Sequence, residues 1–319
     1  MSTSIFADRA AQVPRAIEGQ IAMQQIRAVE DGLSVLAPAK INLSLLVSGK
    51  RPDGFHEIET LMAKVSYFDE VLIETGRKEG IELLCTGPCW APEGRENLVY
   101  QACELLLERC GAKGDIKVTL TKNIPAGSGL GSASSDAAST LIGLNEQLGL
   151  AIERGELMEL APELGSDVTF FLGGPLAMCS GKGEKIKKID EEFDFAALLV
   201  LPDVTVSTKE VYANYRHNAA VYERLMTEIN RHIEKNRIDL ISGMCANILE
   251  RSCFDLYREL AELKAEIESL GIRPVCLSGS GSAFFHIRRG GEVAQLRQIQ
   301  HKLNDTLGCK SVIVSNIRW

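Results

Sequence analysis

Two polar residues suited to acid–base chemistry lie inside otherwise apolar segments of this chain. Lys40 is in the segment 37–43 (APAKINL), and Asp167 is in the segment 164–168 (LGSDV). An aspartate at the junction of a glycine-bounded turn and an apolar run can accept the proton of a hydroxyl group during phosphoryl transfer. A lysine can tune the pKa of a neighbouring carboxylate or bind a phosphate. The same aspartate could instead cap a short helix, and the sequence leaves both roles open.

A glycine- and serine-rich segment lies between these two residues and runs into an alanine-rich helical pattern. Glycines let the backbone approach an anion, and the N-terminus of a following helix offers N–H groups to a phosphate. The segment therefore favours a phosphate site, although a flexible connector or a tight turn has the same composition. It has neither the Walker spacing nor the dinucleotide spacing of glycines. The candidate ATP-binding residues are Pro125, Ala126, Gly127, Ser128, Gly129, Leu130, Gly131, Ser132, Ala133, Ser134 and Ser135.

Polar and apolar residues alternate around Lys40, which predicts a strand with Lys40, Asn42 and Ser44 on one face. That face could be solvated, or it could contact a ligand. A turn signal follows at 52–57 (PDGFHE) and contains His56, one of five histidines in the chain. Near the C-terminus, 278–282 (SGSGS) predicts either a second anion loop or a tight turn.

These candidates need a scaffold, and hydrophobic periodicity predicts an α+β order with antiparallel character. The expected strands are 35–48, 61–75, 80–86, 115–121, 175–180, 195–201 and 310–316. The expected helices are 96–110, 134–148, 151–163, 208–215, 219–235, 238–247, 255–270 and 291–307. An acidic stretch at 190–194 marks the expected boundary between a domain at 34–194 and a ferredoxin-like domain at 195–319. Residues 1–33 are expected to form a flexible or loosely docked extension.

Composition excludes several classes of function. Lys and Arg number 35 against 43 Asp and Glu, and the net charge of −8 argues against a general binder of nucleic acid or anionic membranes. No apolar stretch approaches the roughly 20 residues that span a bilayer. Nine cysteines are scattered without a Cys-x-x-Cys pair, so we expect reduced thiols. We expect a soluble, cytoplasmic protein that is a monomer or weak homodimer and acts on a small molecule.

The order of these motifs resembles the GHMP kinase superfamily. Its members share an N-terminal strand box, a Pro-x-x-x-Gly-Leu-Gly-x-x-x-Ser phosphate loop and a late glycine motif, and all three occur here in that order, within about 34–316. The segments 37–43 and 52–57 are most similar to the branch that phosphorylates the 2-hydroxyl of cytidine-diphosphate methylerythritol in the non-mevalonate route to isoprenoid precursors. Further similarity lies in 95–99, 164–168, 206–208 and 277–281.

The resemblance implies a two-domain GHMP kinase fold, with the ATP loop in an N-terminal α/β domain and a ferredoxin-like α+β domain after it. It implies Lys40 and Asp167 as the catalytic pair and the loop 125–135 as the ATP site. It also implies that Asn42, His56 and Asp167 lie on the substrate side. ATP and Mg²⁺ are the implied cofactors, and no protein ligand of the metal stands out.

The loop by itself does not identify the substrate. Ser132 and Ala133 stand where this branch usually has Gly-Gly, and they resemble the loops of homoserine and mevalonate kinases. The segment 53–56 (DGFH) distinguishes the substrate better. Two alternatives stay open: another GHMP small-molecule kinase of the homoserine or mevalonate type, and a catalytically inactive nucleotide-binding sensor.

Overall fold

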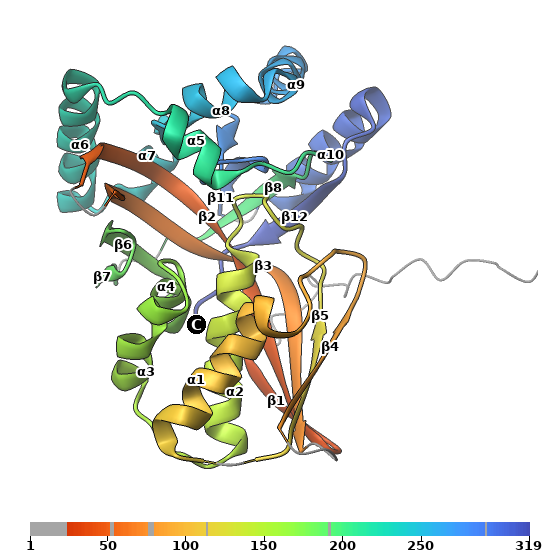
Figure 1. The fold of residues 1–319 in the computed structure, drawn as a ribbon. Helices are drawn as coiled ribbons and strands as arrows, with labels where there is room; N and C mark the ends of the chain where they lie inside the picture. The colour runs from red at the N-terminus through yellow and green to blue at the C-terminus, as the bar shows by residue number, and fades with distance from the viewer. Residues whose placement is uncertain (1–23, 52–53, 76–79, 113, 191–192, 291) are drawn as a thin grey trace, which may run out of the picture.

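A long, curved hairpin connects the two lobes of the chain (Figure 1). The computed structural model describes residues 24–319 apart from 52–53, 76–79, 113, 191–192 and 291. The hairpin consists of β2 (Gly32–Lys50) and β3 (His56–Thr75), which pair antiparallel. It carries Lys40, Asn42 and His56, so the element shared by the lobes also carries three residues expected in the site.

The first lobe packs helices against a mixed sheet. Its strands are β1 (Ile26–Val29), β2, β3, β5 (Ile116–Thr121) and β4 (Ile81–Thr86) in that spatial order, with β6 (Leu176–Gly181) paired to β3 and β7 (Lys185–Lys188) paired to β6. Its helices are α1 (Leu98–Cys110), α2 (Ser132–Gln147), α3 (Arg154–Leu160) and α4 (Val168–Leu172), with 3-10 turns at Gly94–Glu96 and Ala161–Glu163. A buried cluster that includes Ile73, Leu106, Leu141 and Phe170 forms the core between them.

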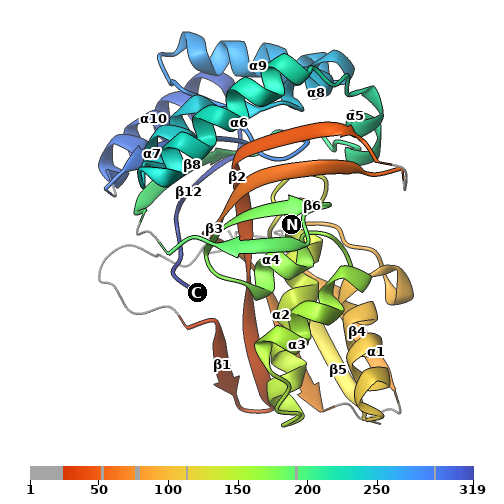
Figure 2. The same ribbon diagram turned by 90° about the vertical axis from the view of Figure 1, so that its left-hand side faces the viewer.

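The second lobe contains an antiparallel sheet covered by helices. The strand order is β10 (Cys276–Leu277), β11 (Phe284–Arg289), β8 (Phe195–Val200) and β12 (Ser311–Ser315). The helices are α5 (Thr208–Asn214), α6 (Ala219–Glu234), α7 (Ile238–Met244), α8 (Glu250–Leu256), α9 (Arg258–Ser269) and α10 (Val293–Leu307). They lie across the hairpin from α1–α4 (Figure 2). The expected α+β class is confirmed, and no helix within the described ranges is both long and apolar enough to cross a membrane.

Core packing and one strand pairing both cross the expected boundary at 194/195. One buried cluster joins Ile41 and Leu61 of the hairpin to Leu199 and Phe285 of the second sheet. The short strand β9 (Ala246–Asn247) also pairs in parallel with β2. The hairpin therefore contributes to the core of both lobes.

The end of the expected 1–33 extension is part of the sheet, which corrects the prediction of a loosely docked segment for that part. β1 pairs antiparallel with the start of β2, in a register that places Ile26 opposite Val35 and Val29 opposite Gly32. Ile26 packs against the core of the first lobe. The four residues of β1 (IRAV) do not alternate between apolar and polar, so periodicity could not reveal this strand. Residues 1–23 lie outside the described part of the chain.

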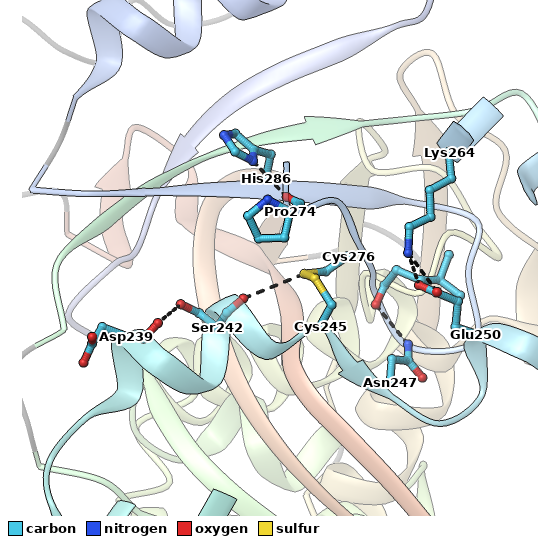
Figure 3. Close-up of a disulfide and its surroundings, with 10 residues drawn as sticks. Asp239, Ser242, Cys245, Asn247, Glu250, Lys264, Pro274, Cys276 and His286 are labelled. Atoms are coloured by element: carbon cyan, nitrogen blue, oxygen red, sulfur yellow. Dashed lines mark hydrogen bonds and ion pairs between the residues drawn. A yellow bond between two sulfur atoms is a disulfide. The ribbon is translucent and has the colours of Figure 1, made fainter. Parts of the chain in front are cut away.

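Two of the nine cysteines form a disulfide, which corrects the expectation of reduced thiols throughout. Cys245 and Cys276 are bonded with their Cα atoms 5.0 Å apart (Figure 3). The bond ties the end of α7 to β10, two residues before the second glycine–serine run. The two positions are 31 residues apart and belong to no spacing motif, so the pairing could not be read from the sequence.

Candidate active site

A cavity of about 990 Å³ is lined by residues of both lobes. Almost every residue singled out from the sequence reaches it: Lys40, Asn42, His56, Asp167, and all of 125–134. Ser135 is the exception, because it is fully buried inside α2 and does not line the cavity. The fold thus brings together four segments that are far apart in the sequence.

Lys40 and Asp167 form the charged centre of this cavity. The Lys40 Nζ lies 3.8 Å from the Asp167 Oδ2, and the side chains are 5% and 31% exposed. Asp167 occupies the N-cap position of α4, but its carboxylate makes no capping hydrogen bond, so it is directed to the lysine rather than to the helix. Burial lowers the pKa of Lys40, and the Asp167 carboxylate opposes that shift. The carboxylate is open to a ligand while its partner ammonium is buried.

Two further oxygen atoms hold the Lys40 ammonium. Its Nζ donates to Asn42 Oδ1 at 2.6 Å and to the Gly129 carbonyl at 2.8 Å. The Asn42 Nδ2 in turn donates to Thr60 Oγ1 at 2.8 Å. This strand face is buried, so a solvated face is ruled out. Register shifts in the β2–β3 pairing flank residues 39–42. Such irregularities re-aim side chains next to active sites.

The glycine loop is a built turn rather than a flexible connector. Gly127, Gly129 and Gly131 all have positive φ, at 65°, 74° and 73°. A Cβ on Gly129 would lie 2.1 Å from the Ser278 carbonyl oxygen, so only glycine fits there. Gly131 is the N-cap of α2 and provides no side-chain cap for the amides of this 16-residue helix, and residues 132–134 of its first turn line the cavity. This arrangement suits an anion such as phosphate.

The second glycine–serine run supports the first. Ser278 Oγ donates to the Gly129 carbonyl at 3.0 Å, and the Ala283 N–H donates to the Ser128 carbonyl at 3.0 Å. Only Gly279 and Ser280 of the run line the cavity. Of the two expectations for this run, the contacts favour a tight turn, which holds the glycine loop in place, and not a second anion site.

A buried ionic cluster beneath the loop was not foreseen from the sequence. Lys122 Nζ lies 2.5 Å from Asp69 Oδ2 and 2.6 Å from Asp136 Oδ2, and it also donates to Ser132 Oγ. Burial pulls the pKa of Lys122 down, but Asp136 and Asp69 outweigh it and the net shift is upward. Burial and the Asp69 charge raise the pKa of Asp136 well above its usual value. The cluster joins Asp69 of β3, Lys122 directly after β5 and Asp136 of α2, and no spacing motif links these positions.

His56 lies at an aromatic part of the cavity. Its ring centroid is 5.8 Å from those of both Tyr212 and Tyr215, and its Nδ1 lies 3.2 Å from the Ser48 carbonyl oxygen. Phe55 is 55% exposed, and Lys182 Nζ lies 4.2 Å from its ring centroid. Lysines 50, 182 and 209 also line this cavity. Aromatic faces with nearby cations suit a flat base that carries phosphates.

An apolar wall lies on the nucleotide-loop side and was also missed. Trp90, Pro92 and Leu98 line the cavity, and Trp90 is 72% exposed. The preceding Cys89 N–H donates to the Lys122 carbonyl at 3.1 Å, which places this wall beside the end of β5, just before the glycine loop. The one available signal was a large aromatic residue, tryptophan, in a loop-like segment rich in Pro and Gly.

The residues present fit a Mg²⁺ ion that arrives with phosphates, although the described residues form no metal cage of their own. No group of three His, Cys, Asp or Glu side chains that could hold a metal occurs among the described residues. Mg²⁺ at nucleotide sites takes one or two carboxylates and completes its shell with phosphate oxygens and water. Ser132 and Asp136 line the cavity at the start of α2, and the buried Asp136 Oδ1 has no hydrogen-bond partner.

Comparison with known protein families gives two matches. Residues 97–175 match GHMP kinases N terminal domain, and residues 220–303 match GHMP kinases C terminal. Together they include the glycine loop and Asp167 but not the strand that carries Lys40.

Relatives and solved structures agree with these matches. The chain is 38% identical over 256 residues to the 4-diphosphocytidyl-2-C-methyl-D-erythritol kinase of Bacillus cereus (strain B4264), covering 79% of this chain and 87% of the relative. It is 36% identical over 253 residues to the enzyme of that name from Clostridium botulinum (strain Eklund 17B / Type B), covering 79% and 90%.

Two solved structures place the fold. A crystal structure of 4-(cytidine 5'-diphospho)-2C-methyl-D-erythritol kinase superposes with a TM-score of 0.69 at 33% identity, over 88% of this chain and 98% of that one. A homoserine kinase from Cytophaga hutchinsonii gives a TM-score of 0.72 at 22% identity, over 93% and 98%, which shows a shared fold alone. The two-domain fold expected from the motifs is thereby confirmed, and the chain belongs to the GHMP kinases, in the family of 4-diphosphocytidyl-2-C-methyl-D-erythritol kinases.

Proposed function

We propose that this chain transfers the γ-phosphoryl group of ATP to the 2-hydroxyl of 4-diphosphocytidyl-2-C-methyl-D-erythritol, a step in the non-mevalonate route to isoprenoid precursors. One observation carries the proposal: a single cavity contains the Lys40–Asp167 pair, a rigid glycine loop and the His56 aromatic part. The names of relatives at 36% and 38% identity support the same substrate. ATP-dependent phosphorylation is the activity of the family.

Asp167 is the proposed general base. Its partly exposed carboxylate would accept the proton of the substrate hydroxyl as that oxygen attacks the γ-phosphorus, and the ADP oxygen would leave. Lys40 would pair with the Asp167 carboxylate and would offset negative charge on the transferring group. Its bonds to Asn42 and Gly129 support this role, because they fix the ammonium between the base and the glycine loop.

Residues 125–134 are the proposed triphosphate site. The amides at the start of α2 would donate to phosphate oxygens, and the positive end of the helix dipole would favour their charge. Bound Mg²⁺ would neutralise phosphate charge, with Ser132 and Asp136 as its protein ligands. The wall of Trp90, Pro92 and Leu98 would receive the adenine ring. Ser135 is the expected loop residue with the least support, because it is buried away from the cavity.

His56 is the proposed contact to the cytosine base. Its Nδ1 faces the Ser48 carbonyl, which leaves Nε2 for the base edge, and Tyr212 and Phe55 offer aromatic faces nearby. Lysines 50, 182 and 209 suit the diphosphate of the substrate. Asn42 has one Nδ2 proton engaged with Thr60 and would direct the other to a substrate oxygen.

A substrate panel with coupled detection of ADP tests the proposal. The cytidylyl substrate should support turnover, whereas mevalonate and homoserine should not. Turnover with mevalonate or homoserine but not with the cytidylyl substrate would assign another GHMP kinase activity. The absence of ATP consumption with all three alcohols would favour the inactive sensor. We also propose that the protein is cytoplasmic and is a monomer or weak homodimer. Gel filtration with light scattering measures its oligomeric state.

A further inference from the structure

Lys64 is a fully buried lysine outside the active-site cavity. It lies on β3 directly opposite Lys40 on β2, and it is 0% exposed. Its Nζ donates to the carbonyls of Phe171 at 2.9 Å and Gly173 at 3.1 Å, and it lies 5.9 Å from the Phe170 ring centroid. The contacts described for this ammonium are thus backbone carbonyls and a ring, an unusual environment for a charge.

These carbonyls belong to the C-terminal end of α4, the helix that begins after Asp167. A five-residue helix has little stability of its own, and the carbonyls of its last turn lack partners within the helix. Lys64 takes two of them, and the Arg154 Nε donates to the third, Leu172, at 2.7 Å. Burial lowers the pKa of Lys64 to about 7, and its charged form also interacts favourably with the dipole at this end of the helix.

Two cross-strand lysines therefore hold the two ends of α4. Lys40 contacts Asp167 at the start, and Lys64 contacts Phe171 and Gly173 at the end. Directly opposed residues of an antiparallel pair lie on the same face, so one point in the β2–β3 register aligns both ammonium groups. The position of α4 along its axis is fixed from both sides.

The same helix contacts the glycine loop. A Cβ on Gly131 would lie 2.9 Å from Phe171 Cζ and 3.0 Å from Lys40 Cγ, so the loop rests directly on α4 and on the catalytic lysine. A shift of α4 would therefore move Asp167 relative to both. Misplacement of a reacting group by about 1 Å can cost on the order of 10²-fold in rate.

We propose that Lys64 is a positioning residue for phosphoryl transfer, which sets the place of the Asp167 carboxylate by fixing the C-terminal carbonyls of α4. The proposal rests on the proposed role of Asp167 as general base. A merely structural role would lower stability without a selective effect on kcat. The two roles are separated by comparing kcat with KM at a matched loss of stability.

The test uses Lys64→Met, with Leu106→Ala as the control. Leu106 is a buried core residue of α1, so its truncation lowers Tm while the hydrogen bonds from Lys64 to the carbonyls of Phe171 and Gly173 stay in place. We expect Lys64→Met to lower kcat at least about tenfold with KM for ATP within about threefold. Leu106→Ala should keep kcat within about twofold at a similar Tm loss. A Lys64→Met enzyme with unchanged kcat, or with only KM raised, overturns the proposal.

A second variant keeps the test decisive if Lys64→Met does not fold. Arg154→Met removes the other cation from the same row of carbonyls, and it should lower kcat about two- to fivefold with KM for ATP unchanged. An unchanged kcat in Arg154→Met then overturns the proposal. Asp167→Asn is measured in parallel, because turnover retained in that variant refutes the base assignment and not the effect of Lys64 on kcat.

Discussion

The ammonium of Lys40 bridges Asp167 and the Gly129 carbonyl, at 3.8 Å and 2.8 Å, and so connects the proposed base to the phosphate loop. Both distances depend on the short β2 segment between two register shifts. A change at the base, at the lysine or at the loop should therefore have distinct and measurable consequences.

Asp167→Asn should retain ATP binding and lose turnover by at least about 10²-fold, because an amide cannot accept the substrate proton. Coupled ADP release gives the rate, and nucleotide binding by calorimetry gives the affinity. Near wild-type turnover would contradict the role of Asp167. Since Asp167 is not a side-chain cap of α4, the loss should not come from unfolding, and an unchanged Tm checks this.

The alkaline limb of kcat should report Lys40. Burial lowers its pKa, so its charge is lost at a lower pH than that of an ordinary lysine as pH rises. Lys40→Arg, which stays charged, should move the limb to higher pH even if its maximal rate is lower. Measuring kcat from pH 6 to 10 at saturating substrates gives the alkaline limb of each enzyme. The same limb in both enzymes would assign the titration to another group.

Gly129→Ala should raise KM for ATP and destabilise the fold by more than about 1 kcal/mol. The added Cβ combines a positive φ with a 2.1 Å approach to the Ser278 carbonyl oxygen, so both glycine–serine runs must move. The matched control is Gly155→Ala in α3, where an added Cβ meets nothing within 4 Å. Thermal melts and ATP kinetics of the two variants should diverge, and equal behaviour would contradict the rigid loop.

Lys122→Met should destabilise the protein by about 3–5 kcal/mol, because it leaves the carboxylates of Asp69 and Asp136 buried without their cation. Lys117→Met is the control, because Lys117 lies on β5, the strand that ends directly before Lys122. Lys117 pairs with Glu74 at 36% side-chain exposure, so its loss should cost less than about 1 kcal/mol. Urea unfolding measures both values, and similar losses would contradict the structural role of the cluster.

The sequence predicted the conformation and orientation of residues best where a local pattern reflects a local conformation. Alternation placed Lys40 and Asn42 on one face, and the glycines at 127, 129 and 131 marked the turn before α2. The burial of that strand face could not be predicted, because the cover comes from segments more than 80 residues away, such as Gly129 and Ser278.

The missed features all depend on long-range packing. Asp69, Lys122 and Asp136 come from three elements and satisfy one another only after the lobe has folded. The contacts of Lys64 with Phe171 and Gly173 are equally non-local, and α4 is too short for its end to show in the sequence. The direction of the Asp167 carboxylate is likewise non-local: it faces the distant Lys40 and does not cap α4.

The bond between Cys245 and Cys276 makes the segment between them a covalently closed ring that contains α8 and α9. A single protease cut within either helix would nick this ring without releasing a fragment. The nicked chain would migrate as one species under non-reducing conditions and as two after reduction. The part of the second lobe next to the glycine–serine turns therefore keeps its connectivity even when its peptide backbone is broken.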